Sequence, residues 1–276
     1  DENHIKFIKE FYPNVKNTFF ITQGGRKSEN LISLAERPID VIYMGSQTAF
    51  HGFPAISFLS DNGSDLYSYC VNFLFSDNSK TAHEAIKKYL SEKNIELSDS
   101  DFFELNHDCA DSITNYVRRE YKFLGMHALD QAGIHVDVYG GDSWVDSENS
   151  YSPNIKLHER VDIEELLKKA SQSKISLCFV PWFKKGCSEK NFDSMLNGAL
   201  CISDRSEYLD EHYQDGKNII YFDLNNPAQM AADVKWLLEH IDAAEQIAQK
   251  GYETALKYDS ADIMYEKIYN LMNQIK

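Results

Sequence analysis

Three lysines surround a loop in the second half of the chain where an anion could bind. Residues 175–180 (ISLCFV) have the length and composition of a buried parallel strand, and Pro181 ends it. The loop that follows carries Lys184 and Lys185, and Lys190 stands where helical spacing begins. A helix N-terminus at the carboxyl edge of a parallel sheet presents free N–H groups and the positive end of the helix dipole. These residues therefore predict an anion site, in a chain whose formal net charge is −15.

The residues after this loop complete a unit of strand, loop, helix and strand. Apolar side chains recur at helical spacing between 192 and 199, and residues 200–203 form a second short strand. Gly186, Asn191 and Asp193 lie in the loop and the first helical turn, so they are candidate ligand contacts. Asp193 could equally have no ligand, because an acid in the first turn of a helix is favoured by the helix dipole alone.

Glycines also stand where two other predicted strands end. The apolar run 39–44 leads into Gly45 and Ser46, and the later strand at 135–139 leads into Gly140 and Gly141. A glycine at the carboxyl end of a strand allows a ligand or a helix to approach the backbone closely. A plain tight turn would explain either position as well.

A long amphipathic helix is predicted over 111–131, and it carries Arg118, Arg119 and Lys122 within five positions. Three basic residues so close together usually form a solvated helix face. The spacing alone leaves open whether any of them contacts a ligand.

The segment 186–204 resembles the donor-site segment of GT-B glycosyltransferases, most of all the branch related to the spore-maturation protein CgeB. That branch reads roughly G-x-x-x-R-x-F-E-A-x-x-C-G-x-x-x-x-T-D. Here Lys190 stands for the Arg, Asp193 for the Glu, Asn197 for the Cys and Ser203 for the Thr. Three flanking segments, VDVYGGDSW, NIKLHERVDIEELLKKA and DGKNIIYFD, follow in family order. The resemblance begins near residue 14, and it is weakest between 50 and 111.

The resemblance implies that Lys190 faces the diphosphate of a nucleotide sugar and that Asp193 bonds the ribose hydroxyls. These two residues are the best candidates for catalysis. Retaining GT-B enzymes carry Glu at positions i and i+8, but here Lys185 occupies the first position and Asp193 the second. This departure leaves the sugar contact and the stereochemistry open, and it permits a second hypothesis: a non-catalytic GT-B-like module for interaction or assembly.

The resemblance also implies the remaining donor contacts. It implies that Arg118 and Arg119 contact the phosphates. It also implies that the backbone of the turn at Arg160 and Val161 hydrogen-bonds the edge of the nucleobase. The donor would be a UDP-sugar or another NDP-sugar, and the acceptor a glycan, a protein or a small molecule. GT-B enzymes generally stabilise the departing diphosphate without a metal ion, so neither a metal nor a cofactor is expected.

The alternation of short apolar runs with amphipathic helices predicts an α/β fold, a Rossmann-like parallel sheet of about six strands with helices on both faces. Residues 38–276 would form this nucleotide-sugar-binding domain, with a helical insertion at about 52–110. Residues 1–37 would be a crossover arm from a missing N-terminal, acceptor-binding domain, with a short strand at 17–22. On this view the isolated chain transfers no sugar.

Composition narrows the partners and the compartment. Acidic residues outnumber basic ones by 43 to 28, which disfavours nucleic acid as a partner. No apolar run approaches the ~20 residues of a membrane span. Five cysteines without CxxC spacing indicate reduced thiols and a cytoplasmic protein, and the family resemblance implies a bacterial one.

Overall fold

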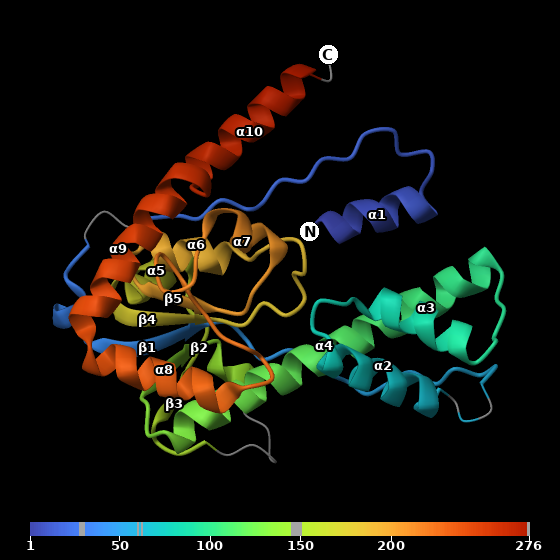
Figure 1. The fold of residues 1–276 in the computed structure, drawn as a ribbon, viewed down its shortest axis with the longest axis horizontal. Coiled ribbons are helices and arrows are strands. Elements are labelled where there is room, and N and C mark those ends of the chain that lie inside the picture. Colours follow the sequence, from blue (N-terminus) through green and yellow to red (C-terminus); the bar gives the residue numbers. More distant parts are fainter. Residues whose placement is uncertain (28–30, 60, 62, 145–150, 275–276) are drawn as a thin grey trace.

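Six parallel strands form the centre of the computed structural model, which describes residues 1–27, 31–59, 61, 63–144 and 151–274 (Figure 1). The strands are β1 (Ile39–Met44), β2 (Val136–Tyr139), β3 (Ile155–His158), β4 (Ser173–Cys178), β5 (Leu200–Ser203) and β6 (Ile220–Tyr221). Their order is β3-β2-β1-β4-β5-β6, and every pair is parallel. The predicted parallel sheet of about six strands is therefore confirmed. The order reverses between β1 and β4, and ligands of open α/β sheets bind at such a point.

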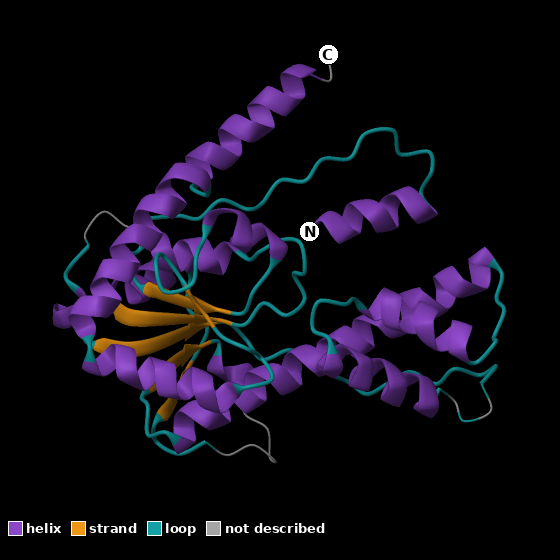
Figure 2. Cartoon of the chain, in the orientation of Figure 1, coloured by secondary structure: helices purple, strands orange, loops and turns teal. Residues whose placement is uncertain are grey.

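Helices cover both faces of the sheet, because successive side chains of a buried strand point to opposite sides (Figure 2). On one face Val41 and Tyr43 of β1 share a core with helix α4 (Asp99–Gln131) and helix α8 (Pro227–Glu239). On the other face Ile42 and Met44 pack against helix α5 (Ile163–Ser171). Helix α6 (Glu189–Leu196) covers the same side further along, where its apolar residues surround Cys178 and Cys201.

The connection from β1 to β2 is helical and extends away from the sheet (Figure 1). It contains α2 (Ser64–Ser76), α3 (Ala82–Glu92) and α4, and its first part is the region where a helical insertion was predicted. The sequence predicted a helix over 111–131 that is separate from the helices of the insertion at about 52–110, but α4 is one helix of 33 residues that begins at Asp99. Its buried stripe explains this, since apolar residues recur every fourth position through the predicted break: Leu105, Cys109, Ile113, Val117 and Tyr121.

The first residues form a helix and a long arm that is not a strand. Helix α1 (Glu2–Phe11) precedes an extended passage that leads to a short 3-10 helix, η1 (Leu34–Glu36). The strand predicted at 17–22 is wrong, because residues 12–24 make no strand pairing. Among the described residues of the arm, Gly25 alone forms a β-bridge, to Ser260. The arm contacts distant parts of the chain instead, as where the ring of Phe20 lies 5.8 Å from that of Tyr208.

The remaining helices complete the domain after β2. A 3-10 turn, η2 (Gly141–Ser143), follows β2, and α7 (Glu207–His212) follows β5. Two helices, α9 (Ile241–Tyr258) and α10 (Ala261–Gln274), end the described chain. None of the described helices has the length and apolar character needed to cross a membrane.

Candidate functional site

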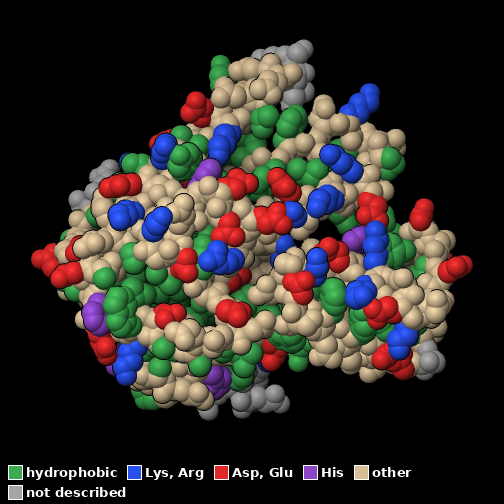
Figure 3. Space-filling model, in the orientation of Figure 1, with side chains coloured by type: hydrophobic (Ala, Val, Ile, Leu, Met, Phe, Trp, Pro, Cys, Tyr) green, Lys and Arg blue, Asp and Glu red, His purple; other side chains and the backbone are tan. Residues whose placement is uncertain are grey.

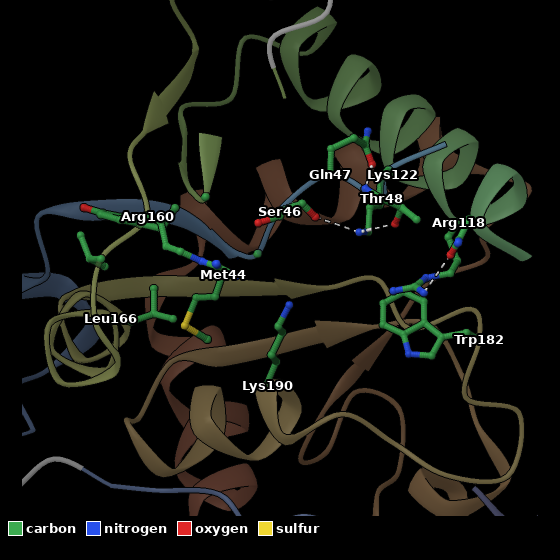
Figure 4. A pocket seen from close by; sticks show the side chains of 16 residues that line it. Met44, Ser46, Gln47, Thr48, Arg118, Lys122, Arg160, Leu166, Trp182 and Lys190 are labelled. Atoms are coloured by element: carbon green, nitrogen blue, oxygen red, sulfur yellow. Dashed lines mark hydrogen bonds between the residues drawn. The ribbon is translucent and has the colours of Figure 1, made fainter. Parts of the chain in front are cut away.

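A cleft of about 470 Å³ lies at the carboxyl ends of β1, β2 and β4, beside the point where the strand order reverses. Arg118, Lys122, Arg160 and Lys190 line it, and Figure 4 shows their side chains directed toward one space. No Asp or Glu is among its described lining residues. The others are polar, aromatic or apolar: Met44, Gly45, Ser46, Gln47, Thr48, Ala49, Asn115, Tyr139, Gly140, Val161, Leu166 and Trp182. Four cations without a carboxylate make this cleft suited to an anion of high charge.

Lys190 reaches the cleft from the first turn of α6, and Gly45 makes room for it. The helix begins at Ser188, whose hydroxyl accepts from the Lys190 N–H at 3.4 Å. A Cβ atom at Gly45 would lie 2.5 Å from Lys190 Nζ. Burial lowers the pKa of Lys190, and the charges of Arg118 and Arg160 lower it further, against the opposing effect of Glu189. A bound anion would remove this penalty.

Gly140 serves the same edge in another way. Its φ of 108° lies in the left-handed region, and a Cβ there would approach the backbone of Gly45 and Ser46 to 3.0 Å. Glycine at this position therefore allows the ends of β1 and β2 to meet closely.

Two successive turns of α4 supply two further cations, of which Lys122 is buried. Lys122 is only 3% exposed, and its Nζ donates to the Ser46 carbonyl at 3.0 Å and to Thr48 Oγ1 at 2.9 Å (Figure 4). Burial lowers its pKa to about 7, and Arg118 and Lys190 add to this shift. These two hydrogen bonds hold the amine at the cleft wall in either protonation state.

Arg118 lies one turn before Lys122 and stacks on an aromatic ring. Its guanidinium carbon is 3.7 Å from the centre of the Trp182 ring, and its Nη1 donates to Asn115 Oδ1 at 3.3 Å. The buried Nε has no hydrogen-bond partner within the described residues. A buried donor left unpaired is costly, so this N–H is available for a ligand.

The opposite end of the cleft is mainly apolar, although Arg160 also lies there (Figure 4). Met44, Val161 and Leu166 line it, and Tyr139 stacks on the His158 ring at 4.5 Å between centroids with planes 5° apart. Figure 4 shows Met44 and Leu166 on the far side of Lys190 from Trp182. The cleft therefore joins an apolar end, which can accept a planar group, to a cationic end.

Seven of the residues that the sequence indicated come together here. They are Gly45, Ser46, Arg118, Gly140, Arg160, Val161 and Lys190. The loop after β4 contributes less than predicted, because Lys185 and Gly186 do not line this cleft. Lys185 Nζ lies 2.5 Å from Glu207 Oε2, and a Cβ at Gly186 would lie 3.1 Å from Asp1 Cα.

Asp193 and Asn191 have structural partners instead of facing the cleft. Asp193 is 3% exposed, and its carboxylate accepts from the Arg26 N–H at 2.7 Å and pairs with the Arg26 guanidinium at 2.6 Å. Asn191 Oδ1 accepts from the Ser188 N–H at 3.3 Å, and its Nδ2 donates to Ser203 Oγ at 2.9 Å. The ribose contact predicted for Asp193 thus has no counterpart in this arrangement.

Arg119 and Gly141 also lie outside the cleft lining. Neighbouring residues of a helix point about 100° apart, so Arg118 and Arg119 cannot both face the same cleft directly. A Cβ at Gly141 would come within 2.7 Å of Leu157 Cβ, so this glycine allows the turn after β2 to pack on β3.

Lys122 and Trp182 were not predicted as site residues, although signals for both were present. Lys122 follows Arg118 by four positions, which places the two on one helix face. Trp182 comes two residues after Val180, at the carboxyl edge where parallel strands end. Gln47, Thr48 and Tyr139 carry no comparable signal.

Comparison with known proteins identifies the family. A family model described as glycosyl transferase-like matches residues 118–269, more than half of the chain. This chain belongs to the glycosyl transferase-like family. The matched region includes most of the site, from Arg118 to Lys190.

Two solved structures share the fold. TarM superposes with a TM-score of 0.51 at 12% identity, over 99% of this chain and 42% of TarM. An α-glucosyltransferase in complex with UDP-glucose and DNA containing an abasic site gives 0.50 at 14% identity, over 97% of this chain and 61% of that protein. This chain spans less than two thirds of the length of either. Its fold is that of the C-terminal Rossmann-like domain of GT-B glycosyltransferases, as predicted. No curated protein matches the sequence.

Proposed function

We propose that this chain binds a nucleoside-diphosphate sugar in the cationic cleft and supplies the donor site of a glycosyltransferase. The observation that carries the proposal is the convergence of Arg118, Lys122, Arg160 and Lys190, with no carboxylate among the described residues that line the cleft. A nucleoside diphosphate brings the matching groups, a charged diphosphate joined to a flat base. The diphosphate would lie among the cations, and the base would lie toward Tyr139 and Leu166.

Sugar transfer would use the cations to stabilise the leaving group. As the bond from the anomeric carbon to the diphosphate breaks, the diphosphate takes the electron pair and its charge grows. Fixed donors that meet this growing charge lower the barrier, and those in a water-poor site are the most effective. Lys190 and the unpaired Nε of Arg118 are the groups placed to do this. In the described residues no group of three or more His, Cys, Asp or Glu is arranged to hold a metal ion.

The motif residues at 186–204 support a finer assignment to the CgeB-like, bacterial branch, and the five unpaired cysteines support a cytoplasmic protein. UDP is the first donor nucleotide to test, because an α-glucosyltransferase of the same fold is in complex with UDP-glucose. The acidic net charge favours a glycan, protein or small-molecule acceptor over nucleic acid.

A non-catalytic module of the same fold is the second candidate. It is favoured by the position of Asp193, whose carboxylate pairs with Arg26, and by Lys185 at the position of a family Glu. In the first case the acid is present but occupied by Arg26, and in the second a lysine replaces the acid, so neither position offers the donor a free carboxylate.

Calorimetry with UDP, GDP and their sugar conjugates tests the proposal. We expect saturable binding of at least one nucleotide at micromolar to millimolar concentration, with slow release of free nucleotide from its sugar conjugate. Binding without any such release over hours would favour the non-catalytic module. If no nucleotide binds at millimolar concentration, the donor-site proposal fails.

Binding should weaken as the pH rises from 7 to 9. Lys122 has its pKa lowered to about 7, so its amine is half protonated near pH 7 and mostly neutral at pH 9. A bound diphosphate favours the ammonium form, so binding takes up a proton in this range, and affinity falls by at most about tenfold per pH unit. Calorimetry in two buffers of different ionisation enthalpy measures the proton uptake.

Lys122→Met is the control for this effect. The variant should bind more weakly at pH 7, and its affinity should change much less between pH 7 and 9. An unchanged slope in the variant would show that another group is responsible.

A further inference from the structure

A second cleft, of about 650 Å³, adjoins the first. It lies between α1, the helical insertion and the loop after β4, and Figure 3 shows a hollow between the first residues and the insertion. Phe7 and Glu10 line it from α1, His83 from α3, and His107 and Asp111 from α4. Glu10 links α1 to α3, because its carboxylate lies 2.7 Å from Lys87 Nζ and 3.4 Å from His83 Nε2.

The two clefts share Arg118 and Trp182. A line of hydrogen bonds along α4 leads to this shared pair: Asn115 Nδ2 donates to Asp111 Oδ2 at 2.9 Å, and Arg118 donates to Asn115 Oδ1 at 3.3 Å. The charge of Asp111 also acts on the guanidinium of Arg118, raising its pKa against the stronger effect of burial. A group bound in the second cleft near Asp111 therefore lies next to the cationic end of the first.

One face of α4 lines both clefts, and its charge reverses along the way. Asp111 lies on the side of the second cleft, and Lys122, eleven residues later, lies in the first. The second cleft is also mixed in charge, since its described lining contains four acids, Asp1, Glu10, Glu84 and Asp111, five Lys or Arg residues and three His. Such a lining does not select a polyanion. It offers donors and acceptors for hydroxyl groups, beside the apolar faces of Phe7 and Trp182.

We propose that the second cleft binds the acceptor, a neutral compound with several hydroxyl groups such as a sugar, with Asp111 and Arg118 at the junction where transfer occurs. The inference rests on the proposed donor site. It differs from what the sequence implied, because the acceptor would be held by the insertion and α1, and not only by a separate domain.

Sugar transfer at this junction forms one bond and breaks another. An acceptor hydroxyl oxygen forms a bond to the anomeric carbon, and the bond from that carbon to the diphosphate oxygen breaks. The diphosphate leaves with the electron pair. The hydroxyl proton goes to a carboxylate at the junction, for which Asp111 is placed, or to the departing phosphate. The products are the glycosylated acceptor and the free nucleoside diphosphate.

The test measures nucleotide release from UDP-glucose and UDP-N-acetylglucosamine by the whole chain, with and without acceptors. The acceptors are glycerol, methyl glycosides and disaccharides, and a single-stranded oligonucleotide serves as a polyanionic comparison. We expect one or more neutral acceptors to accelerate release at least tenfold and to yield a glycosylated product by mass spectrometry. Failure of every neutral acceptor, or acceleration by the oligonucleotide alone, overturns the proposal.

Two variants locate the acceptor in the second cleft. Asp111→Asn should lower the acceptor-dependent rate by about ten- to a hundredfold, as expected for the loss of a charged hydrogen-bond partner. Thr114→Trp, which fills the cleft, should raise the KM for the acceptor at least tenfold. Asp108→Asn is the matched control, because Asp108 is an exposed acid of α4 that lines neither cleft.

The two proposals fail in different ways. If UDP does not bind by calorimetry, the donor site is wrong and the acceptor inference falls with it. If UDP binds but Thr114→Trp keeps the acceptor-dependent rate and KM of the unaltered chain, the acceptor lies elsewhere. Retained UDP binding in each variant shows that the chain has folded.

Discussion

Replacing Lys190 with alanine should weaken nucleoside-diphosphate binding by about 10- to 150-fold. This is the ratio that corresponds to the loss of one charged hydrogen bond, about 1.5–3 kcal/mol. Lys190 extends from the first turn of α6 into the space opposite Gly45, where the diphosphate of the proposed donor would lie. Its burial near Arg118 and Arg160 adds to the loss, because an anion there relieves repulsion among three cations.

Titration calorimetry of UDP and GDP at pH 7 measures this effect, and Lys185→Ala is the matched control. Both lysines come from the same loop and helix start, but Lys185 pairs with Glu207 and does not line the cleft. We expect the control to bind within about twofold of the unaltered chain, since an exposed ion pair contributes little to a distant site. Equal losses in the two variants would mean that the general positive charge of the loop, and not the cleft, attracts the nucleotide.

The sequence predicted the residues at the carboxyl edge of the sheet better than those that α4 contributes. Gly45, Gly140 and Lys190 could be found because a parallel sheet brings all its carboxyl ends to one edge, whichever order the strands take. The choice between Arg118 and Arg119 could not be made, because it depends on the rotation of α4 against the sheet. That rotation is set by the buried stripe from Leu105 to Tyr121, and the first part of this stripe lies before residue 111, where the helix was predicted to begin.

The contacts of Asp193 could not be predicted for a different reason. The motif places an acid at this helical position, but its partner, Arg26, lies 167 residues earlier in the chain. The arm that carries Arg26 was predicted to hold a strand, and it is instead an extended passage fixed to α6. Long-range contacts of an irregular segment have no periodicity, so no local pattern can predict them.

Changing Asp193 to asparagine should destabilise the fold by about 1–3 kcal/mol and leave nucleotide binding unaltered. The carboxylate is buried and holds Arg26 through the backbone N–H and the guanidinium. Breaking a fully buried pair costs about 3–5 kcal/mol. The loss here should be smaller, because the Arg26 side chain is 44% exposed and can be hydrated when its partner is removed. Urea unfolding measures the change, with Asp108→Asn as a control of equal charge.

The loss of stability in the partner variant Arg26→Ala should depend on pH. Burial raises the pKa of Asp193, and the hydrogen bonds and charge of Arg26 oppose that rise. Without Arg26 the pKa should rise further, so the folded state holds the proton over a wider range than the unfolded state does. Stability then falls as the pH rises from the unfolded value near 4 through the raised folded pKa, and Arg26→Ala should be more destabilising at pH 7 than at pH 4.5. If Asp193→Asn instead keeps full stability and loses UDP binding, the carboxylate contacts the donor, as the family motif implies.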